Sequence, residues 1–396
     1  MSIAITGLGC VTGLGSDAPS THEALARGVA KLARSTHFHT AIDVPVVELA
    51  MTNADLADKI GCPECAQYPR TVLLGLLAAS EAYHQAHIGD GEGRRVALVS
   101  ATTTGGMDLS EQYYAAEHAG AKAEPRLLRM HDAGFSSQAI AKYLGIRHYV
   151  TTISTACSSA ANAILLGKRL LQCNMADVVL AGGCEALTRF TLNGFAALGL
   201  LDPLPSRPFD KSRAGLNLGE GAGYVVMERE GERDAEVLAR LVGAGNANDA
   251  YHQTASSPNG EGAFLAMRAA LADAGVTAEQ VDYINAHGTG TPNNDETEYV
   301  AFTRVFGERV PPYSSTKSST GHTLGAAGGV EAVLSVQALM HGVVYANRNI
   351  TEPDSSFAVP PVMGYERRDG MVHVMSNTFG FGGNCTSLLF AKGVTA

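Results

Sequence analysis

The sequence predicts an α/β protein built from two similar halves. Short runs of β-branched residues that end in Gly, Thr or Ser loops alternate with Ala- and Leu-rich stretches, which is the pattern of a buried sheet covered by helices. The order helix, strand, glycine loop occurs in the first half of the chain and again in the second. A length of 396 residues, of which 45% are hydrophobic, is sufficient for a large core. The alternative is one irregular α/β domain with chance alternation.

The repeated order can be followed along the chain. The expected helix, strand and glycine loop are 71–87, 95–100 and 102–106 in the first half, and 264–274, 281–286 and 288–292 in the second. Gly275 stands where a helix C-cap glycine would. The most polar connector, GERDAEV, lies near residue 235. We therefore expect an N-terminal half over 1–234 and a C-terminal half over 235–396.

Charge and composition exclude several classes of protein. The chain has 29 basic and 39 acidic residues, a formal net charge of -10, and no run of five like charges, so it is not expected to bind nucleic acid. It has no apolar stretch of 18 residues and no signal-peptide pattern, so we expect neither a membrane span nor export. Seven scattered cysteines favour a reducing compartment, the cytoplasm, over a disulfide framework.

The first candidate for chemistry is Cys157, which lies between a β-branched run and an almost wholly apolar helix in residues 149–171. An apolar helix is buried, and its first turn presents unpaired N–H groups and the positive end of the helix dipole to the thiol. We therefore expect a lowered pKa and a reactive thiolate at Cys157. Small neighbours, such as Ala156 and Ser158, leave room for a bulky substrate, although close helix packing would also require them.

Three further segments are glycine-rich loops with candidate catalytic or substrate-binding groups. His287 follows a predicted strand and precedes glycines, so it faces the crevice at the carboxyl edge of the sheet. Lys317 and His322 lie five residues apart in a Ser/Thr/Gly turn that leads into a helix. The segment 377–384, NTFGFGGN, is expected to be a loop whose backbone N–H groups form an oxyanion hole. Each segment alone has a structural explanation, but packing does not explain their combination with Cys157.

These segments, in this order, resemble the β-ketoacyl-[acyl-carrier-protein] synthases, the condensing enzymes of the thiolase-like superfamily, in the branch with a Cys-His-His triad. The resemblance spans nearly the whole chain. It is carried by ITGLG, TTGG, TACSS, RPFD, LGEGAG, DAYH, AHGTGT, STKSSTGHTLGAAGG and FGFGG. It implies a thiolase-like fold, with the two pseudo-duplicated α/β halves in a layered αβαβα arrangement.

The resemblance implies a role for each residue of the catalytic group. Cys157 would take an acyl chain from a carrier-protein thioester and form an acyl-enzyme, with ping-pong kinetics. His287 and His322 would hydrogen-bond the malonyl thioester carbonyl and stabilise the enolate that forms as CO2 leaves. Lys317 would support the second histidine electrostatically and by a hydrogen bond. The backbone N–H groups of Cys157 and Phe381 would form the oxyanion hole, and Phe381 would also gate the acyl and malonyl sites.

Substrate contacts are implied at four further positions. Thr289 and Thr291 match threonines that contact the pantetheine arm, and Thr104 and Phe379 are expected to bind substrate. Thr104 stands where fatty-acid elongating relatives often have a large apolar residue at the end of the acyl pocket. A small polar residue there is compatible with a longer or less aliphatic acyl chain.

Two carboxylates match family residues near the triad. Glu331 and Asp295 are both expected to be structural, Glu331 by pairing with Lys317. We expect no metal site and no bound cofactor, because the carrier protein delivers the phosphopantetheine arm. The family pattern also implies a dimer, either a homodimer or a heterodimer with a homologue of the chain-length-factor type.

The implied partner is an acyl carrier protein, which is acidic. A net charge of -10 does not favour that partner, so a local basic patch is needed to attract it. Arg126 and Arg129, in EPRLLRM, align with a region that contacts the carrier in relatives. Arg70 and Lys211 are expected to contribute to the same contact.

Several motifs differ from those of the housekeeping fatty-acid synthases, and these differences indicate which pathway the protein serves. Arg147 and His148 replace the usual Gly-Pro before the nucleophile strand, and the closing motif reads GGNC where relatives commonly have GGTN. With HDAGFSS and RAGLNLGEGAGY, these features look more like ketosynthases of bacterial aryl polyene and related type II polyketide pathways. Housekeeping fatty-acid elongation is the alternative. A degradative thiolase uses a second Cys and a single His, and a non-catalytic chain-length partner would lack the nucleophile.

Three other patterns do not indicate a site. GLGCVTGLG lacks the third glycine of the dinucleotide-binding fingerprint. Cys62 and Cys65 form a CxxC without a second pair at zinc spacing, so neither a metal site nor a redox site is expected there. The Gly-x-Ser-x-Gly elbow of the serine hydrolases is absent.

Overall fold

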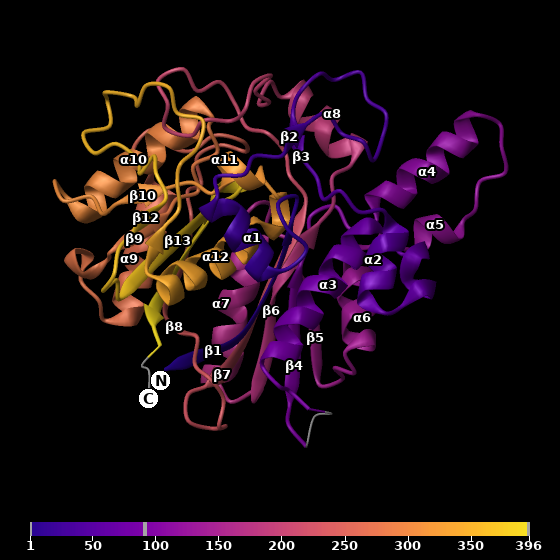
Figure 1. Cartoon of the computed structure of the whole chain (residues 1–396), viewed down its shortest axis with the longest axis horizontal. Coiled ribbons are helices and arrows are strands. Elements are labelled where there is room, and N and C mark those ends of the chain that lie inside the picture. Colours follow the sequence, from indigo (N-terminus) through magenta and orange to yellow (C-terminus); the bar gives the residue numbers. More distant parts are fainter. Residues whose placement is uncertain (1, 90–92, 394–396) are drawn as a thin grey trace.

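The computed structural model describes residues 2–89 and 93–393. Among these residues, ten strands form one mixed sheet in the order β10-β9-β13-β14-β8-β1-β7-β6-β4-β5 (Figure 1). The strands of this sheet are β1 Ile3–Thr12, β4 Val96–Ala101, β5 Tyr149–Ile153, β6 Val178–Glu185, β7 Gly221–Arg229, β8 Ala239–Asn248, β9 Tyr283–Asn285, β10 Tyr313–Ser314, β13 His373–Phe379 and β14 Asn384–Lys392. Two short pairs lie outside it: β2 Leu32–Ala33 with β3 Val46–Val47, and β11 Val343–Val344 with β12 Glu366–Arg367.

The strand order repeats in the two halves of the chain. Counted outward from the middle of the sheet, each half places its first, fifth, fourth, second and third strands in that order, with two antiparallel pairings followed by two parallel ones. The halves meet where β1 pairs with β8, from Ile3 opposite Leu241 to Ile5 opposite Ala239. The predicted duplication of an α/β unit is therefore confirmed, whereas the exact limits 1–234 and 235–396 stay a prediction.

The helices complete a layered arrangement. They are α1 Ala18–Ala26, α2 Asn53–Ile60, α3 Arg70–Gln85, α4 Met107–His118, α5 Arg126–Arg129, α6 Ala133–Tyr143, α7 Ser159–Gln172, α8 Arg189–Ala197, α9 Glu261–Ala274, α10 Pro292–Phe306, α11 Lys317–Thr320 and α12 Ala327–His341. Helices α7 and α12 each follow the third strand of their half, pack against each other and lie between the two parts of the sheet (Figure 1). Helix α3 packs on β1, β7 and β6, and α9 packs on β8 and β14.

Small residues allow α12 to reach the sheet closely. Every residue of α12 from Ala327 to Leu339 is buried, and the helix packs on β7. A Cβ atom added to Gly223 in β7 would lie 2.3 Å from the carbonyl carbon of Gly329 in α12. Because real Cβ atoms do not approach a backbone so closely, the glycines are required for this layer spacing.

Most of the elements expected from the sequence are present, with one strand longer than predicted. Helix α3 and strand β4 fall within two residues of their predicted limits, and α9 ends at Gly275, which has the left-handed φ of 65° expected for a C-cap. The segment 377–384 is not a loop throughout. Residues 377–379 continue β13 and pair with β14, from Asn377 opposite Ser387 to Phe379 opposite Cys385, because the ladder extends beyond the apolar run that indicated the strand.

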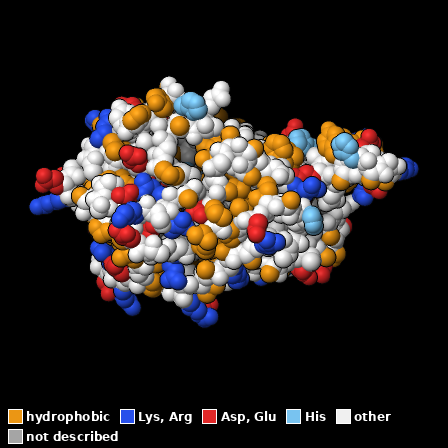
Figure 2. All heavy atoms as spheres, turned by 90° about the horizontal axis from the view of Figure 1, so that it is seen from above, with side chains coloured by type: hydrophobic (Ala, Val, Ile, Leu, Met, Phe, Trp, Pro, Cys, Tyr) orange, Lys and Arg blue, Asp and Glu red, His pale blue; other side chains and the backbone are white. Residues whose placement is uncertain are grey.

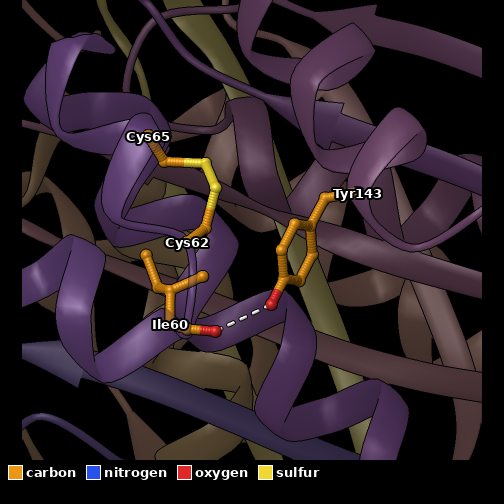
Figure 3. The surroundings of a disulfide bond; sticks show 4 residues. All are labelled: Ile60, Cys62, Cys65 and Tyr143. Atoms are coloured by element: carbon orange, nitrogen blue, oxygen red, sulfur yellow. Dashed lines mark hydrogen bonds between the residues drawn. A yellow bond between two sulfur atoms is a disulfide. The ribbon is translucent and has the colours of Figure 1, made fainter.

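The CxxC motif differs from the prediction. Cys62 and Cys65 form a disulfide, with their Cα atoms 5.3 Å apart (Figure 3). Gly61 ends α2 in the left-handed conformation, and the following 3-10 turn, Pro63–Gln67, folds the chain back and brings the two thiols together. The Tyr143 hydroxyl donates to the Ile60 carbonyl beside it. The other five cysteines are free, Cys173 exposed and the rest buried.

The surface carries one projecting arm. Helices α4 and α5 extend from the body at one end, and the two chain ends lie close together (Figure 1). On the face seen in Figure 2, acidic and basic side chains are scattered rather than gathered into one patch. No helix within 2–89 and 93–393 is long and apolar enough to cross a membrane.

Candidate active site

Cys157 lies in the tight turn that joins β5 to the buried helix α7. Its side chain is 6% exposed, and the preceding residue, Ala156, has a left-handed φ of 52°. A residue with a Cβ rarely adopts this conformation, so the turn is strained. The Ser159 side chain accepts from the Thr155 N–H at 2.8 Å and donates to the Ala156 carbonyl, which holds the turn closed. The predicted position of the thiol at a strand-to-helix turn is confirmed.

His322 contacts the sulfur directly. Its Nε2 lies 3.2 Å from Cys157 Sγ, although the two residues are 165 positions apart in the chain. The Leu324 N–H donates to Nδ1 of the same ring at 3.2 Å. Because Nδ1 accepts a hydrogen bond, the proton of the neutral ring is on Nε2, which therefore faces the sulfur as a donor.

His287 completes the group. Its ring centroid lies 5.5 Å from that of His322 and 5.6 Å from that of Phe379. Glu298 holds the loop that carries His287 by accepting the N–H groups of His287 at 2.8 Å and Gly288 at 2.7 Å. Nδ1 of His287 is buried without a hydrogen-bond partner in the described part of the chain.

The hydrogen bonds of Lys317 involve the first histidine and not the second. Its Nζ donates to the His287 carbonyl at 2.7 Å and pairs with Glu331, and both charged side chains are 3% exposed. The predicted Lys317–Glu331 pair is confirmed. The expected electrostatic effect of Lys317 on His322 is present, since the cation lowers the pKa of that ring. The expected hydrogen bond from Lys317 to His322 is wrong, because the Lys317 Nζ bonds to the His287 carbonyl and to Glu331 instead.

Burial decides the protonation of the site. It lowers the pKa of both His287 and His322 well below the ordinary value, and the Lys317 cation lowers both further, so both rings are neutral at physiological pH. Burial also raises the pKa of the Cys157 thiol to about 11, against the opposing effects of Lys317 and of the backbone N–H groups of Phe381 and Cys157. The expectation of a lowered pKa is therefore wrong, because desolvation of a thiolate outweighs the end of a helix.

A cavity of about 390 Å³ connects these groups. Among the predicted site residues, its lining includes Cys157, His287, His322, Thr289, Thr291, Phe379 and Phe381. The Phe381 ring stacks on that of Phe195, with centroids 5.8 Å apart. The hydroxyls of Thr289 and Thr291 lie 2.8 Å from each other at the cavity. The cavity is thus lined by the sulfur, a stacked pair of aromatic rings and two threonine hydroxyls.

Besides Lys317 and Glu331, two further residues predicted at the site, Thr104 and Asp295, lie outside the cavity lining. The Thr104 hydroxyl donates to the buried carboxylate of Glu185, so substrate binding by Thr104 stays a prediction. Asp295 accepts the N–H groups of Phe209 at 2.8 Å and Gly290 at 3.1 Å. Burial raises the pKa of Asp295, and its contacts are those of the structural residue expected.

The four predicted carrier contacts do not form one surface. Arg70 is 5% exposed, and its guanidinium binds Glu220 and the carbonyl groups of Leu49 and Met51, so its predicted contact with a carrier is wrong. Arg126 and Arg129 are exposed on α5. Lys211 is exposed and pairs with Glu352 at 2.8 Å.

The structure adds residues that the sequence did not single out. Glu298 is buried beneath His287, and burial raises its pKa to about 7. His252 and Gln253 line the cavity opposite the triad, and the Gln253 carbonyl accepts the Gly382 N–H at 2.7 Å. The DAYH motif, which ends at His252, was a sequence signal for the segment that contains His252 and Gln253. Glu298 had no local signal, since its contacts depend on where the helix α10 packs.

The arrangement fits thioester chemistry. It combines a buried thiol, a neutral imidazole donor at the sulfur, a second imidazole in the same cavity and two backbone N–H groups directed at the sulfur. Such donors stabilise the oxyanion and the enolate that form at a thioester carbonyl. No group of three or more His, Cys, Asp or Glu suited to a metal ion occurs in the described ranges.

Comparison with known proteins agrees with this chemistry. Residues 1–233 match the model of the β-ketoacyl synthase N-terminal domain, and residues 238–351 match that of the C-terminal domain. The chain is 33% identical to 3-oxoacyl-[acyl-carrier-protein] synthase 2 of Vibrio cholerae, over 98% of this chain and 99% of that protein.

Two solved structures show the same fold. The ishigamide ketosynthase/chain length factor has a TM-score of 0.92 and 30% identity, with 99% of each chain covered. The ketosynthase ApeO of Xenorhabdus doucetiae, in complex with its chain length factor ApeC, has a TM-score of 0.83 and 30% identity, with 99% of this chain and 98% of that chain covered.

Proposed function

Because the chain belongs to the β-ketoacyl synthase family, we propose that it is the acyltransferase that condenses an acyl chain on Cys157 with a malonyl group on an acyl carrier protein. The observation that carries this proposal is the contact of His322 Nε2 with Cys157 Sγ, with His287 in the same cavity. A degradative thiolase is not favoured, because the cavity contains two imidazoles beside the sulfur.

In the first half-reaction Cys157 becomes acylated. The sulfur attacks the thioester carbonyl of the acyl carrier, the bond from that carbon to the pantetheine sulfur breaks, and the carrier leaves as a thiol with the proton that Cys157 gives up. The N–H groups of Cys157 and Phe381 lie where they can stabilise the oxyanion. The Nε2–H of His322 stabilises the thiolate that attacks.

In the second half-reaction the malonyl thioester loses CO2. The resulting enolate is stabilised by hydrogen bonds from the neutral rings of His287 and His322, and its carbon attacks the acyl carbonyl on Cys157. The carbon–sulfur bond breaks, Cys157 leaves as the thiolate, and the 3-oxoacyl product stays on the carrier. Lys317 keeps His287 in place by donating a hydrogen bond to the carbonyl oxygen of His287.

The partners and pathway follow from the same family. We infer that an acyl carrier protein delivers both substrates and that no further cofactor is needed, since the pantetheine arm comes with the carrier. The solved ketosynthase of 30% identity in complex with its chain length factor supports a heterodimer of this kind, and a homodimer is the alternative. Thr104 and the GGNC motif favour an aryl polyene or related type II polyketide pathway over primary fatty-acid synthesis.

Intact-mass analysis tests the function. We expect exposure to a panel of acyl-carrier thioesters to add the mass of one acyl group to the protein, and Cys157→Ala to abolish this adduct. Cys157→Gln should release CO2 from malonyl-carrier without condensation. Cys173→Ala, at the exposed free cysteine, should keep the adduct. Retained condensation in either Cys157 variant would show that the sulfur is not the nucleophile.

A further inference from the structure

Glu185, the last residue of β6, is fully buried and accepts six hydrogen bonds. Its Oε1 accepts from the Thr102 hydroxyl at 2.8 Å, the Thr104 N–H at 3.1 Å and the Thr104 hydroxyl. Its Oε2 accepts from the Thr103 N–H at 2.8 Å, the Thr103 hydroxyl and the Gly325 N–H at 3.2 Å. No ion pair in the described part of the chain includes Glu185, so these donors alone compensate a carboxylate there.

The sixth donor belongs to the turn that orients His322. Gly325 follows Leu324, whose φ of 47° is left-handed and therefore costs energy for a residue with a branched side chain. The N–H of the same Leu324 donates to Nδ1 of His322. A Cβ atom added to Gly325 would lie 2.6 Å from Glu185 Oε2, so the turn and the carboxylate are in close contact.

The ring of His322 also packs edge-on against that of His287, with centroids 5.5 Å apart, and two further hydrogen bonds hold its backbone. The His322 N–H donates to the Asn217 carbonyl at 2.8 Å, and the His322 carbonyl accepts the Gly219 N–H at 3.0 Å. Neither contact determines the conformation of Leu324. The hydrogen bond on Nδ1 therefore comes from a strained turn whose next N–H is bonded to Glu185.

We propose that Glu185 is a positioning residue, which anchors the threonine segment 102–104 and the turn after His322 to one carboxylate and so keeps Nε2 of His322 on the Cys157 sulfur. Only the expected effect on the condensation rate rests on the proposed function; the expected effect on Cys157 alkylation does not. The threonine segment links Glu185 to the other side of the site. It follows β4, and β4 pairs with β5, the strand that leads to Cys157, from Ala97 opposite Tyr149 to Ala101 opposite Ile153.

The test is the variant Glu185→Gln, which keeps the size of the side chain but replaces one acceptor oxygen by an NH2 donor. The readout is the pH dependence of Cys157 alkylation by iodoacetamide, measured in a Cys173→Ser background that removes the exposed thiol. We expect the alkylation rate at a given pH to fall at least about threefold and the whole profile to move to higher pH, because the thiolate loses its Nε2–H donor. In the condensation assay kcat should fall at least about tenfold, with KM for the acyl carrier within about twofold of the parent.

Glu228→Gln is the matched control. Glu228 is also a buried carboxylate, 3% exposed, on β7 opposite Val178 at the other end of β6. It accepts from the Thr6 hydroxyl at 2.6 Å and pairs with Arg233. Replacement of the Glu228 carboxylate by an amide should lower the melting temperature, and it should change neither the pH profile of alkylation nor kcat.

The direction of the shift separates the explanations. Removal of a nearby negative charge without movement of His322 would make the thiolate easier to form and move the profile to lower pH, which would overturn the proposal. An unchanged profile with an unchanged kcat would show that Glu185 is only structural. A shift of the same size in Glu228→Gln would overturn the proposal as well.

Two features keep the test decisive. If Glu185→Gln does not fold, Thr103→Val removes one of the six donors from a partly buried position and should move the profile in the same direction by a smaller amount; no movement would refute the proposal. Alkylation does not require a carrier substrate. A failed condensation assay in the parent protein would therefore count against the proposed function and leave the result for Glu185 intact.

Discussion

Cys157 is controlled by burial more than by the helix that follows it. The thiol is 6% exposed, and desolvation raises its pKa to about 11 even though Lys317 and the N–H group of Phe381 act in the opposite direction. The resting site therefore contains a neutral thiol and neutral imidazoles. Nucleophilicity must come from the Nε2–H of His322 and the backbone donors at the moment when a thioester enters the cavity.

The pH dependence of alkylation follows from this pKa. Since the pKa of the Cys157 thiol is raised, the thiolate fraction at neutral pH is small and grows about tenfold for each pH unit below the pKa. In the Cys173→Ser protein, we expect the second-order rate constant for iodoacetamide to rise in this way from pH 7 to at least pH 9.5. Mass spectrometry of the labelled peptide assigns the site. A plateau that begins near pH 8 would contradict the raised pKa.

Lys317 shows what residue types alone can indicate. The family resemblance implied its pair with Glu331, and the structure has that pair. Which histidine the lysine serves was not predictable from the spacing of five residues to His322, because the ammonium group reaches the carbonyl of His287, 30 positions away in the chain. That contact depends on how the β9 and β10 ends lie side by side.

At the scale of elements, the two buried helices determine where the site forms. Helix α7 begins two residues after Cys157 and α12 begins shortly after His322. The two helices pack against each other, so their N-terminal approaches bring the two residues together. This explains why a thiol and an imidazole from different halves of the chain meet at 3.2 Å.

The packing of α12 on β7 yields a stability prediction. Gly223→Ala would place a Cβ atom 2.3 Å from the backbone of Gly329, so we expect unfolding to become easier by about 1–3 kcal/mol or more. Urea denaturation followed by circular dichroism measures the change.

Gly194→Ala is the control for this prediction. Gly194 lies in α8, and a Cβ atom added there meets nothing within 4 Å. Alanine in an open helical position should stabilise the protein by up to about 1 kcal/mol. Equal effects of the two substitutions would show that α12 and β7 can move apart at little cost.

At the scale of the whole molecule, the continuous sheet joins two copies of one topology, and the cavity lies between the polypeptide segments that each copy contributes. The residues that reach the cavity come from the carboxyl-side loops of both halves. Helices α4 and α5 project from the body (Figure 1). Arg126 and Arg129 on α5, together with the exposed Lys211, are the predicted carrier contacts that remain.

Charge reversal on the arm tests docking of the acidic carrier. We expect Arg126→Glu with Arg129→Glu to raise KM for the acyl carrier at least severalfold at low salt, with little change in kcat, because surface charges steer association. The effect should shrink as salt screens the charges. Initial rates at several carrier and salt concentrations measure this.

A matched double reversal is available on the other side of the molecule. Arg367→Glu with Arg368→Glu changes the charge by the same amount at the end of strand β12 and in the residue that follows it, far from α5 (Figure 1). It should leave KM unchanged. An unchanged KM in the α5 variant, or an equal rise in both variants, would exclude α5 as the docking surface.

The sequence by itself determined the α/β class, the duplicated order of elements and the identity of Cys157, His287, His322 and Lys317, because each depends on local patterns: strand and helix periodicity, glycine loops and short motifs. Arg70 shows the limit of such patterns. As a basic residue it was expected to contribute to the carrier contact, whereas its guanidinium lies against Glu220, 150 positions away.

Only the tertiary structure decided the contacts and the energies. The tautomer of His322, the six donors on Glu185, the Cys62–Cys65 disulfide and the direction of the Cys157 pKa shift all depend on which groups are packed together and how much water is excluded. Burial, turn geometry and contacts between segments are properties of the folded chain, so no local pattern contains them.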